Sequence, residues 1–156
     1  MTVIRKDSVP VTQGASGYPD PYSLGEGFLS FRHLSDAAGL TQFGCALETL
    51  NPGKQSSQQH WEEHEDEFLY MLDGSLTVVE GDTDTVLVPG DACGWKAGDP
   101  VAHTLKNHTD KPAVYLIMGS RRRENICHYP GLDLVGTPDG YTHLDGTPYP
   151  KQGETK

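Results

Sequence analysis

Turn-forming residues recur at short, regular intervals through the middle of the sequence. Between Asn51 and Met118 they lie roughly 8–12 residues apart, a spacing typical of all-β sandwiches and barrels. The stretches between the turns are rich in β-branched and aromatic residues, which favour strands. This pattern leaves no room for long helices and predicts an all-β fold. The turn signals are Pro52-Gly53, Asp73-Gly74, Gly81-Asp82, Pro89-Gly90, Gly98-Asp99 and Asp110-Lys111-Pro112.

Composition points to the same fold class. Of the 156 residues, 18 are Gly, 11 are Pro and only 35% are hydrophobic, which fits many short strands joined by tight turns. A chain of this length is the size of one domain and can bury a core. One turn allows a finer prediction: Asp73-Gly74 suits a type I′ hairpin, in which both central residues have positive φ.

The sequence divides into three parts around one β-rich core. Residues 1–41 are expected to form an extended segment and the first strands, residues 42–120 the core of a β-barrel, and residues 121–156 a turn-rich extension. The extension is too polar to form its own core, so it should pack across the barrel or against a second subunit, with its last few residues disordered. These long ends, together with exposed edge strands, predict a homodimer.

Charge and apolar content exclude several classes of partner. The formal net charge of −10 argues against a nucleic-acid partner, because phosphate binding needs a basic surface. No apolar run approaches the roughly 20 residues that span a bilayer, and the N-terminus lacks the apolar part of a secretory signal. Three separated cysteines, Cys45, Cys93 and Cys127, are typical of reduced thiols, so we expect a cytoplasmic protein.

Residues His60 to Glu67 hold two imidazoles and five carboxylates in the sequence HWEEHEDE. Side chains alternate along a strand, so His60 and Glu62 would share one face, about 7 Å apart. A first-row divalent metal accepts imidazole and carboxylate together. His103 lies further along the chain, in a second alternating stretch that a neighbouring strand could bring back to this cluster.

Two spaced motifs make the sequence resemble the cupins, a superfamily of small double-stranded β-helix (jelly-roll) barrels. The first cupin motif is matched by Gly53, His60, Glu67 and Gly74. The second is matched by Gly90, a turn that ends at Pro100, His103 and Asn107. The resemblance covers roughly residues 42–120, and it implies that His60, Glu67 and His103 bind one divalent metal ion.

Three positions depart from the cupin motifs. Glu62 stands where cupins usually have a second histidine, Pro100 replaces a glycine, and the Gly53-to-His60 spacing is one residue longer. A site of His60, Glu62, Glu67 and His103 would carry two carboxylates and suit manganese, iron, zinc or nickel. His64 is the alternative to Glu62 if the strand continues straight through it. A third possibility is that the pocket no longer binds metal.

The resemblance leaves two functions open. One is a metal-dependent oxygenase, isomerase or lyase that acts on an unidentified small molecule. The other is a non-catalytic cupin that binds a small ligand, with or without metal. No catalytic residue is predicted: Tyr70 alternates with Leu69 and Met71, so it should face away from the site.

Overall fold

The computed structural model describes residues 2–5 and 7–150 and is almost entirely built from short strands. The all-β prediction is confirmed, since the described residues contain a single short helix, α1 (Leu34–Ala37). The strands are β1 (Thr12–Ala15), β2 (Glu26–His33), β3 (Phe43–Leu50), β4 (Trp61–Glu62), β5 (Glu67–Asp73), β6 (Leu76–Glu80), β7 (Thr83–Leu87), β8 (Ala92–Trp95), β9 (His103–Lys106), β10 (Ala113–Ser120), β11 (Cys127–His128), β12 (Val135–Thr137) and β13 (Gly140–Thr142).

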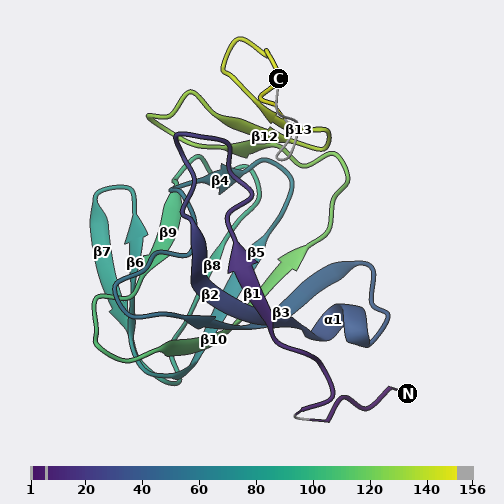
Figure 1. Ribbon diagram of the computed structural model, residues 1–156, viewed down its shortest axis with the longest axis vertical. Coiled ribbons are helices and arrows are strands. Elements are labelled where there is room, and N and C mark those ends of the chain that lie inside the picture. The colour runs from purple at the N-terminus through teal and green to yellow at the C-terminus, as the bar shows by residue number, and fades with distance from the viewer. Residues whose placement is uncertain (1, 6, 151–156) are drawn as a thin grey trace.

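The strands form three antiparallel sheets. A six-stranded sheet has the order β1-β2-β3-β10-β5-β8, and a three-stranded sheet has the order β7-β6-β9. The third sheet, in the order β13-β12-β11-β4, lies at one end of the molecule, at the top of Figure 1. We call it the C-terminal sheet, because three of its strands come from the last part of the chain.

One hydrophobic core joins the six-stranded and three-stranded sheets. Leu69 and Met71 of β5 are fully buried, and they pack in one cluster with Leu76 and Val78 of β6. Tyr70 lies between the two buried β5 residues and is 40% exposed, as the alternation along the strand predicts. No helix of the described residues is long and apolar enough to cross a membrane.

The turn at Asp73-Gly74 differs from the prediction. Gly74 has a φ of +74°, but no non-glycine residue in the described part of the chain has a positive φ, so the turn is not type I′. Moreover, β5 and β6 belong to different sheets, and the turn carries the chain from one sheet to the other. The hairpin lies one turn later, at Gly81-Asp82 between the paired strands β6 and β7. Turn residues predict a change of direction, but not which strands pair.

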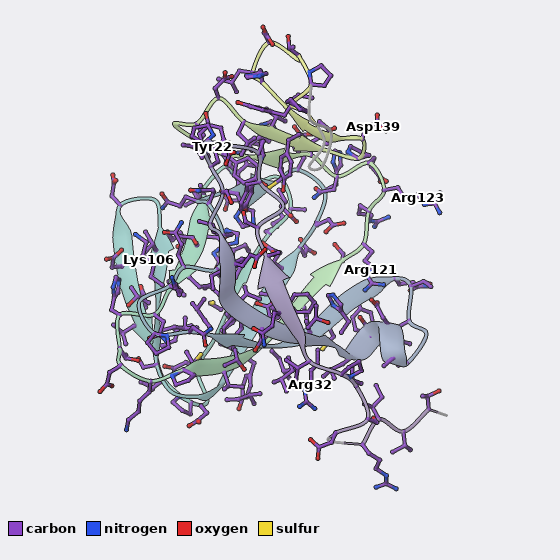
Figure 2. All side chains as sticks on the ribbon, in the orientation of Figure 1. Tyr22, Arg32, Lys106, Arg121, Arg123 and Asp139 are labelled. Atoms are coloured by element: carbon purple, nitrogen blue, oxygen red, sulfur yellow. The ribbon has the colours of Figure 1, made fainter. Side chains whose placement is uncertain are left out.

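Both ends of the chain contribute strands to the sheets. The N-terminal segment supplies β1 and β2 to the six-stranded sheet, and the extension after β10 pairs with β4 through β11. Arg121 lies on the connection to this extension, where it forms an ion pair with Asp36 of α1 (Figure 2). The disorder predicted for the last few residues concerns 151–156, which lie outside the described residues.

A partly buried carboxyl group lies on β3 beside the core. Glu48 of β3 is directly opposite Tyr115 of β10, whose hydroxyl donates a 2.9 Å hydrogen bond to Glu48 Oε2. Burial raises the pKa of Glu48 to about 7, and the negative charge of Glu67 adds to the effect, while the hydrogen bond from Tyr115 opposes it. Near neutral pH this carboxyl therefore holds its proton far more often than an exposed glutamate.

Gly74 allows a direct test of the turn between the two sheets. A Cβ at this position would lie 2.5 Å from the carbonyl oxygen of Pro112, whereas a Cβ at Gly53, with a similar φ of +70°, would contact nothing. Gly53→Ala should therefore lose about 1 kcal/mol of stability from φ alone. Gly74→Ala should lose about 1–3 kcal/mol more from the clash. Urea unfolding of both variants checks this, and equal losses would contradict it.

The Glu48 carboxyl predicts a pH dependence of stability. Below pH 4.5 the folded and unfolded states both hold its proton; between pH 4.5 and about 7 the unfolded state loses the proton first. Glu48 should therefore contribute a fall in the free energy of unfolding of the metal-free protein as pH rises through this range. The slope of this free energy against pH should accordingly be more negative in the wild type than in Glu48→Gln. Urea unfolding at several pH values measures both slopes. Equal slopes in the two proteins would contradict a raised pKa for this partly buried carboxyl.

Candidate metal site

His60 and His103 are neighbours across an antiparallel bridge. The backbone N–H of each donates to the carbonyl of the other, at 3.0 Å and 2.8 Å. Residues paired in this way place their side chains on the same face of the sheet, and the two imidazole rings lie 4.8 Å apart between centroids. This pairing brings together two histidines that are far apart in the sequence, so that both can be ligands of one metal ion.

Glu67 completes a three-residue cluster with these histidines. Its Oε2 atom lies 2.9 Å from Nε2 of His103 and 3.8 Å from Nε2 of His60. Glu67 begins β5, where Gly119 of β10 and Trp95 of β8 are its cross-strand neighbours. The Trp95 ring stacks on His103 with 3.9 Å between ring centroids and fixes the imidazole from one side.

The spacing of these three atoms fits a small divalent ion. Nitrogen and oxygen ligands about 2.1 Å from an ion lie about 3.0–3.4 Å from each other when they are neighbours in octahedral or tetrahedral geometry. The two distances to Glu67 bracket that range. His60 is already in the required tautomer: its Nδ1 lies 2.9 Å from the carbonyl oxygen of Gln58, which can only accept, so Nδ1 carries the proton and Nε2 is left as a donor to metal.

The charge states of the cluster also suit a metal. Burial lowers the pKa of His60, and this outweighs the raising effect of Glu67, so the imidazole is neutral. Burial alone would raise the pKa of Glu67, but the hydrogen bond from His103 and the two imidazoles outweigh it and lower the pKa. A neutral imidazole beside an ionised carboxylate is the form in which both bind metal.

Glu62 belongs to a second group of candidate ligands. This second group consists of Glu62, Cys127 and His60, and its metal-ligand atoms all lie within 4.8 Å of one another. The same limit holds for the first group, His60, Glu67 and His103. His60 is shared by both groups. Burial raises the pKa of Glu62 to about 8, and the charges of Glu67 and Glu65 add to this. The Oε2 atom of Glu62 is shielded from solvent and has no hydrogen-bond partner among the described residues.

His64, the alternative to Glu62, lies outside both groups. Its side chain is 42% exposed, and its Nδ1 is 3.9 Å from Glu63 Oε2. Glu63 also accepts a 2.6 Å hydrogen bond from Nε2 of His128 on the C-terminal sheet. His64 and Glu63 thus form a surface pair beside the site.

Two cavities meet the cluster. One, of about 130 Å³, is lined by Glu67, Trp95 and His103 among others. The other, of about 440 Å³, lies against the C-terminal sheet and is lined by His60, Glu62 and Cys127. Its remaining lining residues are polar, aromatic or glycine: Tyr18, Ser57, Asn125, Tyr129, Gly136, Thr137, Gly140 and Tyr141. Glu62 lines both cavities. The candidate ligands are therefore reachable by a small molecule.

The sequence motifs did not reveal the residues that the C-terminal extension brings to this cavity. Cys127 is opposite Glu62 in the pairing of β11 with β4, and Tyr129 follows two residues later. Burial raises the pKa of the Cys127 thiol to about 12, although a hydrogen bond with Tyr129 opposes the effect. Only the alternation in Cys127-His128-Tyr129 could have suggested that the cysteine and the tyrosine share a face.

The chain matches the family model described as "Cupin domain" over residues 46–119. No curated protein sequence matches it. Among solved structures, a sugar phosphate isomerase of the cupin superfamily from Silicibacter pomeroyi is 33% identical, with a TM-score of 0.87 over 96% of this chain and 97% of that one.

Two further structures are more distant. A putative sugar phosphate isomerase from Acidithiobacillus ferrooxidans is 26% identical, with a TM-score of 0.69 over 81% of each chain. A polyketide cyclase from Streptomyces resistomycificus shares only the fold, at 20% identity and a TM-score of 0.58 over 77% of this chain and 79% of that one. The extent of the first structural match decides the family: this chain belongs to the cupin superfamily.

Proposed function

We propose that this protein is a divalent-metal-dependent isomerase of a small, sugar-like hydroxycarbonyl compound. The observation that carries the proposal is the convergence of His60 and His103 on one oxygen of Glu67, beside a cavity large enough for a small molecule. The choice of isomerase over oxygenase or lyase is supported by the 33% identity with the Silicibacter pomeroyi sugar phosphate isomerase over nearly the whole of both chains. We include in the proposal that the six- and three-stranded sheets close as a double-stranded β-helix.

His60, Glu67 and His103 would hold the ion, with Glu62 at the edge of the site. A bound divalent ion supplies Lewis-acid polarisation of a carbonyl or hydroxyl oxygen, which is what isomerisation of a hydroxycarbonyl compound needs. The protein's own side chains would bind and orient the substrate. The hydroxyl groups of Ser57, Tyr129 and Tyr141 line the cavity and can donate to or accept from substrate hydroxyls.

A non-catalytic ligand-binding cupin is the second candidate. The cavity against the C-terminal sheet favours it, because Tyr18, Tyr129 and Tyr141 form an aromatic cluster with ring centroids 5.5–6.3 Å apart. Such a wall binds the apolar face of a sugar or another small ligand without requiring catalysis. The two candidates differ in whether the bound molecule is converted.

Elemental analysis combined with an activity screen tests the proposal. Wild-type protein should carry about one divalent ion per chain and interconvert at least one aldose–ketose pair, free or phosphorylated, followed by NMR. His60→Ala and His103→Ala should lose the ion and the activity, because each removes a metal ligand. His64→Ala should keep both, since His64 lies outside the cluster.

The outcomes separate the candidates. A bound ion without conversion of any sugar in the screen would favour the ligand-binding protein. Wild-type protein that takes up no manganese, iron, zinc or nickel would contradict the metal site itself. Loss of metal in His64→Ala would move the ligand assignment to that residue.

The homodimer is also a proposal, supported by exposed strand edges. Among the described residues, β7 pairs on one side only, and it carries Val86, which is 63% exposed. A second copy would cover such apolar edges. Sedimentation equilibrium should give twice the mass of one chain; the mass of a single chain at all concentrations would contradict the dimer.

A further inference from the structure

Strand pairing brings Cys127 to the candidate metal site. β11 pairs with β4 so that Cys127 is opposite Glu62 and His128 is opposite Trp61. Trp61 and His128 stack on each other, with 4.3 Å between ring centroids and 16° between ring planes. Because side chains alternate along both strands, Glu62 and Cys127 share the other face, which lines the cavity beside His60.

These three residues offer the chemistry of a metal site. An imidazole nitrogen, a carboxylate oxygen and a thiol sulfur all lie within 4.8 Å of one another. The Oε2 atom of Glu62 is hidden from solvent and accepts no hydrogen bond from the described residues, so this oxygen is left without a partner there. Neither Cys45 nor Cys93 belongs to such a group among the described residues.

His60 ties the two ligand groups to one ion. Its Nδ1 proton is donated to the carbonyl oxygen of Gln58, so only Nε2 is free to coordinate. One nitrogen lone pair serves one ion. The group of His60, Glu62 and Cys127 and the group of His60, Glu67 and His103 therefore share one ligand nitrogen and serve a single ion.

We propose that Cys127 is a ligand of this ion and that the C-terminal sheet contributes a thiolate to the metal site. The inference rests on the proposed metal site and adds to it a choice of metal. A thiolate beside imidazole and carboxylate favours borderline ions such as zinc, ferrous iron or cobalt over the harder manganese and magnesium. Coordination replaces the S–H bond by an S–metal bond and releases one proton to the solvent.

Cobalt(II) spectroscopy tests the proposal on the full-length protein. Thiolate bound to Co²⁺ gives an intense charge-transfer absorption in the near ultraviolet, which imidazole and carboxylate ligands do not give. The Co²⁺-loaded wild type should show this band, and Cys127→Ser should lose it while still binding Co²⁺ through the remaining ligands. Cys45→Ser is the matched control and should keep the band, because Cys45 lies outside both ligand groups.

A second variant covers the case in which Cys127→Ser does not fold. The double variant Cys45→Ser/Cys93→Ser leaves Cys127 as the single cysteine, and its Co²⁺ form should retain the band in full. X-ray absorption of the Zn²⁺-loaded wild type should show one sulfur about 2.3 Å from zinc. Zinc bound only to nitrogen and oxygen would overturn the assignment of Cys127.

The outcomes distinguish this inference from the proposed function. If elemental analysis finds cobalt bound but the wild type lacks the charge-transfer band, Cys127 is not a ligand and the metal site stands. If no cobalt binds, the proposed metal site fails and the inference fails with it. Removing a residue that only supports a ligand changes metal affinity by about 10–100-fold. Cys127→Ser should therefore weaken zinc at least tenfold and manganese much less, and equal losses for both ions would contradict the thiolate ligand.

Discussion

The antiparallel pairing of His60 with His103 is the interaction on which the candidate site depends. Two backbone hydrogen bonds hold these residues side by side although the chain between them forms β4 to β8. The same segment delivers Glu67 at the start of β5, within 2.9 Å of His103. Backbone pairing therefore sets the relative positions of the ligand residues, and the side-chain rotamers only complete the geometry. A site built on strands in this way is held more precisely than one built on loops.

Excess negative charge is the second constraint at the site. Burial raises the pKa of Glu62 to about 8, and the negative charges of Glu67 and Glu65 add to this effect. Such crowding is costly unless the carboxylates are neutralised by protons or by a cation. A divalent ion would offset two charges at once, and it would also provide partners for the buried Glu62 oxygen that has none among the described residues. The free-energy cost of placing these carboxylates together is thus what a metal-binding role would offset.

The sequence predicted most of the fold because its signals were local and repeated. Regular turns and alternating strands were sufficient for the all-β class, and two spaced motifs identified His60, Glu67 and His103 as neighbours. The pairing at Asp73-Gly74 was predicted wrongly, because a turn signal does not say whether the next strand stays in the same sheet. Cys127 could not be found, because its approach to Glu62 depends on how the C-terminal extension pairs with β4, which is a long-range contact with no motif of its own.

The central claim is that His60, Glu67 and His103 bind one divalent ion. The most direct measurement is anomalous X-ray diffraction from crystals of the cobalt- or zinc-loaded protein, collected on both sides of the metal absorption edge. The account predicts one strong peak about 2.0–2.2 Å from Nε2 of His60, Nε2 of His103 and a carboxylate oxygen of Glu67. A peak that lies only at surface residues such as His64 and Glu63, or no peak in fully loaded crystals, would contradict it.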